Sequence, residues 1–145
     1  MATISGGSKL ISALDGIAKS VTKAATLKVG FLEGSIAPNG QSMPLRAALN
    51  EFGTSRMPPR PFFRSMVAAK SGEWPSAIGN LLVANNYDAQ KTLDQTGVAI
   101  KEQLQQSIRD LVSPPLAEST VRKKGFDKPL IEHDDMLRTV SYQVD

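Results

Sequence analysis

The residues best suited to acid–base or metal chemistry form one run, Glu132-His133-Asp134-Asp135. Carboxylates and an imidazole can hold a cation or exchange protons with a substrate. Four adjacent residues cannot all converge on one centre, however, and Asp134 is well placed to cap a short helix that follows it. We therefore favour a structural interpretation of this run. His133 is the single histidine and cysteine is absent, which excludes histidine–cysteine zinc sites.

Other sequence patterns of catalysis or cofactor binding do not appear. The chain has no phosphate-cradling glycine motif, no nucleophile elbow and no paired metal-carboxylate spacing. Its one glycine pair, Gly6-Gly7, lies in an N-terminal segment (residues 1–7) that we expect to be flexible. We predict a protein that has no catalytic residues, binds no cofactor or metal, and is not an enzyme.

Length and composition indicate one globular domain over residues 1–145. Apolar residues make up 41% of the chain and charged residues 21%, which excludes an intrinsically disordered protein. No apolar run is long enough to span a bilayer, and we expect neither a secretory signal nor a membrane partner. The absence of cysteine fits a reducing compartment.

A proline-rich stretch carries three arginines that could contact a partner. Residues 56–64 read Arg-Met-Pro-Pro-Arg-Pro-Phe-Phe-Arg, and the prolines fix φ, remove backbone donors and hold the chain extended. The stretch is either an ordered loop between two helices or a rigid arm that presents a surface to a partner. The candidate interface residues are Arg56, Met57, Pro58, Pro59, Arg60, Pro61 and Arg64. The aromatic residues expected to anchor the stretch in the core are Phe52, Phe62 and Phe63.

A second basic group lies near the C-terminus, where Arg122, Lys123 and Lys124 precede a glycine. Three like charges at a helix end are usually solvated and interact favourably with the helix dipole. A contact with phosphate is the alternative. The formal net charge of +3, from 17 basic and 14 acidic residues, permits contact with nucleic acid but does not argue for it.

Two helices and a strand are predicted in the first third of the chain. Apolar residues recur at helical spacing over residues 8–25, which predicts a helix with Ser8 as its cap. Residues 27–32 alternate between apolar and other residues, which predicts a strand. Pro44 then opens a short helix, and Gly53 is suited to a left-handed C-cap at its end. The predicted apolar side of that helix is Leu45, Ala48, Leu49 and Phe52.

The longest regular element is an amphipathic helix in the second half of the chain. Asp88 is the predicted cap before it. Gly97 lies in its apolar stripe, where glycine costs about 1 kcal/mol relative to alanine. We therefore expect another element to approach the helix closely at that position. The apolar stripe is Leu93, Gly97, Ile100, Leu104, Ile108 and Leu111.

A second strand is predicted at residues 140–144, where apolar and polar residues alternate again. Two strands far apart in sequence, with helices between them, predict an α+β fold. We expect a small antiparallel sheet packed with the long amphipathic helix and several short helices. Because two short strands are marginally stable alone, either weak strands near residues 33–43 or 56–63 or a neighbouring subunit would complete the sheet.

Several of these segments, taken together, resemble a known family. The order is Val29-Gly30 in the first strand, then Ala47-Ala48 and Asn50-Glu51-Phe52-Gly53-Thr54, then Met57-Pro58-Pro59-Arg60-Pro61-Phe62-Phe63. This arrangement resembles the tail-completion or head–tail joining proteins of tailed bacteriophages. The family includes lambda minor tail protein Z and related neck and virion-morphogenesis proteins.

The later part of the chain is similar to this family as well. The matching segments are the long helix from Leu93 to Ile108, residues 116–124, residues 128–131, Met136-Leu137 and the final strand. The resemblance spans roughly residues 27–145, so the helix over residues 8–25 lies outside it. Such proteins commonly carry Thr-Gly before the last helix, where this chain has His133-Asp134.

The resemblance implies a non-enzymatic, structural role in the virion. The protein would complete the head-proximal end of the tail or join tail to head, as a homo-oligomeric ring around the DNA passage with six-fold symmetry. Its partners would be other tail and neck proteins, namely a tail terminator or tube and the head–tail connector. It would be assembled in the host bacterial cytoplasm, and DNA would pass nearby without sequence-specific binding.

In such a ring, Arg56, Arg60 and Arg64 would form intersubunit ion pairs or face the channel. We favour ion pairs, because a channel that bound DNA tightly would retard its passage. The rival hypothesis is a basic nucleic-acid-binding or assembly-chaperone protein that acts during virion morphogenesis and is not retained in the particle. The basic residues at 122–124 and the isoelectric point of about 9.3 support that rival. A small hydrolase built on His133 is a third hypothesis.

Overall fold

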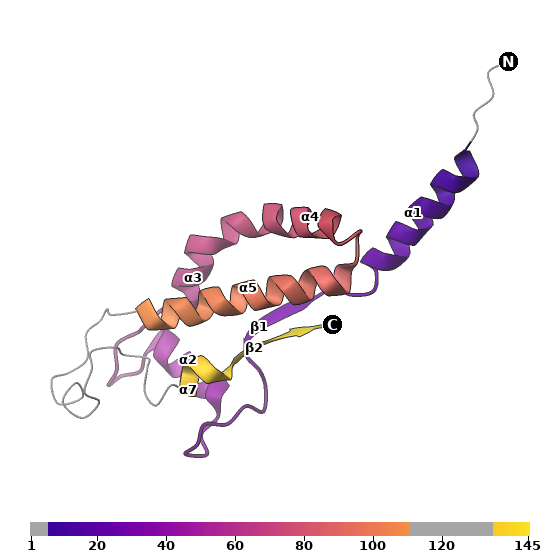
Figure 1. Ribbon diagram of the computed structural model, residues 1–145. Coiled ribbons are helices and arrows are strands. Elements are labelled where there is room, and N and C mark those ends of the chain that lie inside the picture. The colour runs from indigo at the N-terminus through magenta and orange to yellow at the C-terminus, as the bar shows by residue number, and fades with distance from the viewer. Residues whose placement is uncertain (1–5, 111–134) are drawn as a thin grey trace.

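The protein has an α+β fold in which one long helix lies between a two-stranded sheet and two shorter helices (Figure 1). This confirms the predicted fold class. The computed structural model describes residues 6–110 and 135–145. In chain order its elements are α1 (Gly7–Val21), β1 (Leu27–Phe31), α2 (Met43–Phe52), α3 (Phe62–Lys70), the 3-10 turn η1 (Ser71–Glu73), α4 (Trp74–Ala84), α5 (Ala89–Asp110), α7 (Asp135–Thr139) and β2 (Val140–Val144).

The sheet joins two segments that are far apart in the sequence. Strands β1 and β2 pair in antiparallel register, with Leu27 opposite Val144 and Phe31 opposite Val140. Both predicted strands are confirmed. The weak strands considered at residues 33–43 and 56–63 do not form, since each region has only a single bridge. Among the described residues the sheet therefore remains two-stranded, and α5 stabilises it by covering one face.

Helix α5 buries most of the stripe that its spacing predicts. Gly97, Ile100, Leu104 and Ile108 are buried, whereas Leu93 is half-buried. The last predicted member of the stripe, Leu111, lies outside the described residues.

Two threonines also lie on the buried side of α5. The Thr92 hydroxyl donates to the Asp88 carbonyl oxygen and the Thr96 hydroxyl to the Thr92 carbonyl oxygen, both at 2.7 Å. These bonds satisfy the hydroxyl donors, so the residues can be buried at little cost. The Asp88 side chain accepts from the backbone N–H of Lys91 at 3.1 Å, which confirms the predicted cap.

The predicted close approach at Gly97 is confirmed, and its partner is the last strand. A Cβ atom added to Gly97 would lie 2.4 Å from Cδ2 of Tyr142 in β2. That distance is far shorter than a van der Waals contact between carbon atoms. Glycine is therefore required here, because it lets the helix backbone touch the tyrosine ring.

The hydrophobic core lies where α5, α2, α3, α7 and the sheet meet. Polar contacts tie α3 and α4 to α5: the Trp74 indole N–H donates to Gln103 Oε1 at 2.9 Å, and the Ser107 hydroxyl donates to the Phe62 carbonyl oxygen at 2.6 Å. None of the described helices is both long and apolar enough to cross a bilayer. The buried core residues are Ala37, Met43, Ala47, Phe62, Met66, Ile100, Leu104, Ile108, Met136, Leu137 and Val140.

Helix α2 has its predicted ends but buries the opposite face. Ser42 caps its start, and Gly53 follows its end with φ 75° and ψ 179°, a glycine conformation more extended than the predicted left-handed cap. The buried residues are Met43, Ala47 and Glu51, which follow one another at intervals of four. The predicted core side was wrong, because Leu45, Leu49 and Phe52 are exposed.

Helix α1 is shorter than predicted and extends away from the rest of the protein (Figure 1). It begins at Gly7 after Gly6, without a side-chain cap, so Ser8 is not the cap and residue 7 is helical. It ends at Val21 and not at residue 25, because residues 25 and 26 instead hydrogen-bond to Asp145 and so extend the pairing of β1 with β2. No residue of α1 is buried.

We predict that Gly97→Ala lowers the free energy of unfolding by about 1–3 kcal/mol, because the new methyl group overlaps the Tyr142 ring. Denaturant titration monitored by circular dichroism measures this change. Gly79→Ala in α4 is the matched control, since its Cβ would meet nothing within 4 Å. The control should be stabilised by about 0.5–1 kcal/mol. Equal stabilisation of both variants would contradict the close contact.

Candidate functional site

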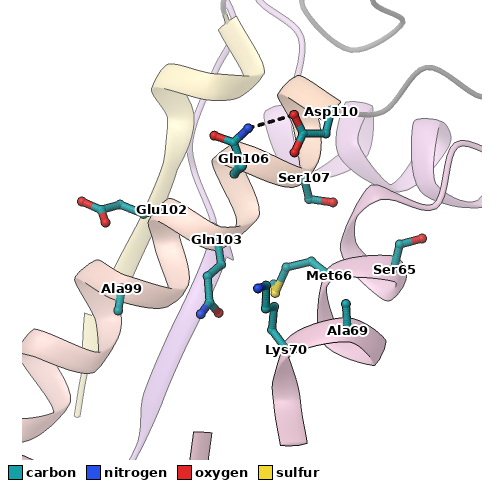
Figure 2. A pocket seen from close by; sticks show the side chains of 10 residues that line it. All are labelled: Ser65, Met66, Ala69, Lys70, Ala99, Glu102, Gln103, Gln106, Ser107 and Asp110. Atoms are coloured by element: carbon teal, nitrogen blue, oxygen red, sulfur yellow. Dashed lines mark hydrogen bonds between the residues drawn. The ribbon is translucent and has the colours of Figure 1, made fainter. Parts of the chain in front are cut away.

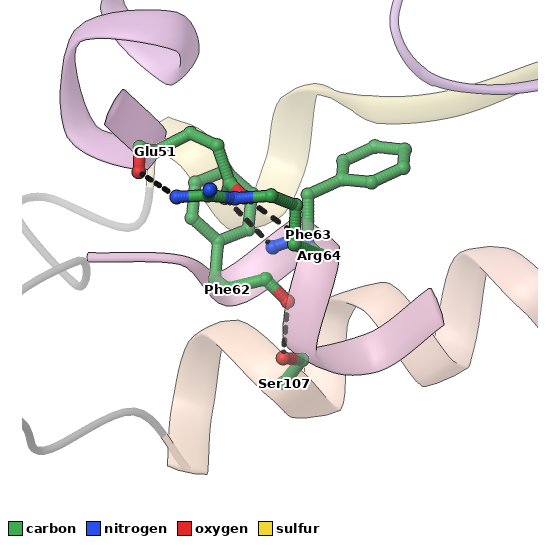
Figure 3. Close-up of polar contacts among 5 residues, drawn as sticks. All are labelled: Glu51, Phe62, Phe63, Arg64 and Ser107. Atoms are coloured by element: carbon green, nitrogen blue, oxygen red, sulfur yellow. Dashed lines mark hydrogen bonds and ion pairs between the residues drawn. The ribbon is translucent and has the colours of Figure 1, made fainter. Parts of the chain in front are cut away.

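The family-like motif consists of two segments, residues 50–54 at the end of α2 and residues 57–63 at the start of α3. The carboxylate of Glu51 joins them (Figure 3). Its Oε2 accepts from the backbone N–H of Phe63 at 2.9 Å, and its Oε1 accepts from the backbone N–H of Arg64 at 3.1 Å. The Arg64 side chain adds a bond from Nε to Oε1 at 2.8 Å and one from Nη2 to the Glu51 carbonyl oxygen at 3.1 Å. The end of α2 is thereby held against the start of α3.

This contact supplies the cap that the local sequence of α3 lacks. Pro61 occupies the N-cap position of α3 and has no side chain that can accept a hydrogen bond. The first N–H groups of a helix need acceptors, and a negative charge there also interacts favourably with the helix dipole. Glu51 meets both needs from another helix, which explains why a carboxylate is buried at this position.

The proline-rich stretch is an ordered loop between α2 and α3 that turns back to α2, which is the first of the two alternatives considered for it. Thr54 and Met57 exchange backbone hydrogen bonds at 2.8 and 3.3 Å. The Arg60 N–H then donates to the Asn50 carbonyl oxygen at 2.7 Å, which brings the chain back beside the end of α2. A Cβ atom on Gly53 would lie 2.7 Å from the Pro59 nitrogen, so this turn closes only around glycine.

The three arginines of this stretch have different environments. Arg56 is exposed, whereas Arg60 is only 6% exposed. Burial lowers the pKa of the Arg60 guanidinium, and its Nε has no hydrogen-bond partner among the described residues. Arg64 is 58% exposed along its side chain but is engaged with Glu51. Of the candidate interface residues, those at the surface are therefore Arg56, Pro58, Pro59 and part of Arg64.

The three aromatic residues of the motif also differ in burial. Phe62 is 1% exposed and packs edge-on against Phe31, with ring centroids 6.0 Å apart. Phe63 is half-buried against the core. The expectation that Phe52 anchors the core is wrong, since Phe52 is 65% exposed. The Arg64 guanidinium lies over its ring, with Cζ 5.1 Å from the ring centroid. Phe52 is on the outer face of α2 because Met43, Ala47 and Glu51 occupy the inner face.

Several sequence predictions concern residues outside the described part of the chain. The basic group Arg122, Lys123 and Lys124 and the first three residues of the run around His133 fall within residues 111–134. The roles considered for them stay predictions. The last residue of that run, Asp135, begins α7 and forms an ion pair with Arg46 at 3.5 Å. Among the residues that the structure describes, no three histidine, cysteine or acidic side chains are close enough to hold a metal ion.

A groove of about 640 Å³ lies between α3 and α5 (Figure 2). Lys70 from α3 and Glu102 and Asp110 from α5 are its charged lining residues. Asp110 accepts a hydrogen bond from Gln106 at 2.8 Å, and the nearby Ser107 hydroxyl is bonded to a backbone carbonyl. The lining contains no histidine or cysteine, so the groove offers space for a ligand or chain segment without an evident pair of nucleophile and base.

The most unusual surface feature is a pair of exposed apolar helix faces. The described residues include nine exposed large hydrophobic side chains, and α1 and α2 hold three each. A smaller pocket of about 230 Å³, lined by Ala47, Ala48, Phe52 and Phe63 among others, adjoins the α2 face. The exposed apolar residues are Leu10, Ile11 and Leu14 on α1 and Leu45, Leu49 and Phe52 on α2.

Sequence reasoning missed the outer face of α2 as a functional candidate because it assigned that stripe to the core. The inner face contains Glu51, and an acidic residue does not look like a core position when only hydrophobicity is counted. The sequence does contain one signal: Pro61 leaves the start of α3 without a side-chain cap, and Glu51 is a nearby carboxylate that can supply one. Comparison of the chain with models of protein families, curated proteins and solved structures found no match.

We predict that Glu51→Gln lowers the free energy of unfolding by about 2–4 kcal/mol, because the charged acceptor for two backbone N–H groups is lost in a buried setting. Arg64→Ala should cost less than about 1 kcal/mol, since its charged group is largely exposed. Denaturant titration of both variants measures the difference. A larger loss for Arg64→Ala than for Glu51→Gln would contradict the capping role.

Proposed function

We propose that the protein is a non-enzymatic structural subunit of a tailed-bacteriophage virion that completes the head-proximal end of the tail or joins tail to head. It acts as one copy in a ring of identical subunits around the DNA passage. The resemblance of residues 27–145 to tail-completion and head–tail joining proteins supports this proposal. The exposed apolar faces of α1 and α2 fit a subunit that binds neighbouring proteins.

The observation that carries the proposal is the pair of uncovered apolar faces on α1 and α2. Contiguous apolar surface of this kind marks sites where other proteins bind. Helix α1 extends from the fold (Figure 1), and its outer apolar residues Leu10, Ile11 and Leu14 are each more than half exposed. A subunit whose surface is completed by its neighbours has this character, whereas an enzyme needs a site with converging polar groups.

The family-like motif fits a supporting role in such a subunit. Its polar groups are used internally, because Glu51 caps α3 and Arg64 is held by Glu51. The motif therefore fixes the position of α2 and the direction in which its outer face points. Since Arg60 is buried, the charged partner contact proposed for this region passes to Arg56.

Quantitative mass spectrometry of purified virions tests the proposed function. The measured quantity is the copy number of this chain relative to a tail-tube subunit, before and after a high-salt wash that removes adsorbed protein. We expect a low, fixed copy number that survives the wash, because a neck or tail-end ring contains few copies. Absence from particles whose infectivity still requires the protein would contradict it and favour the chaperone or nucleic-acid-binding alternative.

A further inference from the structure

The outer part of the apolar face of α1 is uncovered, whereas Ile17 and Val21, nearer the fold, are half-buried. Leu10, Ile11 and Leu14 are each more than half exposed, and Ile17 and Val21 continue the same stripe toward the fold. Polar residues such as Ser12 and Lys19 lie on the other side of the helix. An isolated helix of 15 residues is marginally stable in water, so a covered apolar face is needed to stabilise it. Some other surface must therefore provide the cover.

The segment between α1 and β1 is held against the last residue of the chain. The N–H groups of Ala25 and Thr26 both donate to the Asp145 carbonyl oxygen, at 2.9 and 3.1 Å, and Ala24 is buried. Lys28 Nζ also lies 2.7 Å from the Asp145 carboxylate, and its hydrogen bond is the main cause that lowers the pKa of that carboxyl. Helix α1 precedes β1 and helix α2 comes after it, and the two helices lie on opposite sides of the protein (Figure 1).

The outer face of α2 has the dimensions to receive α1. Its stripe of Leu45, Leu49 and Phe52 runs along a helix of ten residues, which is about 15 Å long. Helix α1, at about 22 Å, covers that length with residues to spare. The Arg64 guanidinium lies over the Phe52 ring at one end of the stripe, and the adjoining pocket beside Phe52 offers a recess for an apolar side chain. Both faces thus expose leucine side chains, and α1 is long enough to cover the stripe on α2.

We propose that the apolar face of α1 in one copy of the chain packs on the outer face of α2 in the next copy. This contact joins two different surfaces, so each subunit donates one helix and accepts one. Repetition of such a contact closes a ring when the rotation between copies permits it. The inference rests on the proposed function, because the ring of identical subunits is part of that proposal and the α1–α2 contact is the one that would repeat around it.

The size of the contact explains why a ring is favoured over a simple dimer. Packing along about 15 Å of one helix covers much less than the roughly 800 Å² per partner of a standard stable interface. A single contact is therefore weak. In a closed ring every copy makes two such contacts, and no subunit can leave without breaking both.

Disulfide trapping between two single-cysteine variants tests this contact directly, because the natural chain has no cysteine. Leu14→Cys, on the apolar face of α1, is mixed with an affinity-tagged Leu49→Cys, on the outer face of α2. Only a contact between two chains can join the two variants. We expect the mixed disulfide to form several-fold faster than either homodimer, because the contact places the two thiols side by side and irreversible trapping accumulates even weak complexes.

Ser12→Cys replaces Leu14→Cys in the matched control, since residue 12 lies on the polar side of α1 and is equally accessible. It should react with Leu49→Cys only at the rate of random collision. Equal rates for Ser12→Cys and Leu14→Cys would overturn the proposal. A double variant, Leu14→Cys with Val83→Cys, tests whether α1 folds onto α4 of its own chain. A disulfide within that chain that forms faster than the mixed disulfide would also overturn the proposal. Binding of the natural protein to anionic lipid vesicles, lost in Leu14→Asp, would overturn it in favour of a membrane surface if the mixed disulfide is absent.

The two proposals can fail separately. Failure of disulfide trapping together with a fixed copy number in virions would reject the α1–α2 contact and leave the virion role standing. Efficient trapping of a protein that is absent from virions would leave the contact standing and reject that role.

Discussion

The carboxylate of Glu51 is the constraint on which much of the arrangement depends. A helix that starts directly after a proline-rich turn has free N–H groups and no side chain of its own to accept from them. Glu51 provides the acceptor from the end of α2, and this fixes the angle and rotation of α2 relative to α3. Because α3 in turn lies against α5, the same bond decides which face of α2 reaches the core and which faces outward.

Helix α5 is the second organising element, since it contacts both the sheet and the α3–α4 layer. A two-stranded ribbon has little stability by itself, and here one side of it is covered by α5. The approach is close enough to require glycine at position 97, where the Tyr142 ring rests on the helix backbone. The sheet, which joins β1 near the start of the chain to β2 at its end, is therefore stabilised by an element from the middle.

The distribution of polar and apolar groups separates the inside of this protein from its outside in an unusual way. A glutamate and an arginine are buried near the motif, whereas leucines, isoleucine and a phenylalanine lie on the surface of α1 and α2. The buried glutamate is accounted for by its hydrogen bonds. The exposed apolar residues find no such explanation within one chain, and this is the physical basis for proposing that neighbouring subunits cover them.

The sequence by itself determined the elements. Both strands, the long helix, a short helix with Pro44 in its first turn and Gly53 just after its end, and the close approach at Gly97 all follow from local spacing and backbone chemistry. Only the tertiary structure decided the orientation of α2 and the environments of Phe52 and Arg60. Hydrophobic periodicity identifies an apolar stripe but cannot tell a core face from an interface, because both exclude water in the same way. The deciding contact, between Glu51 and the start of α3, joins residues 12 and 13 positions apart across a turn, beyond the range of helical periodicity.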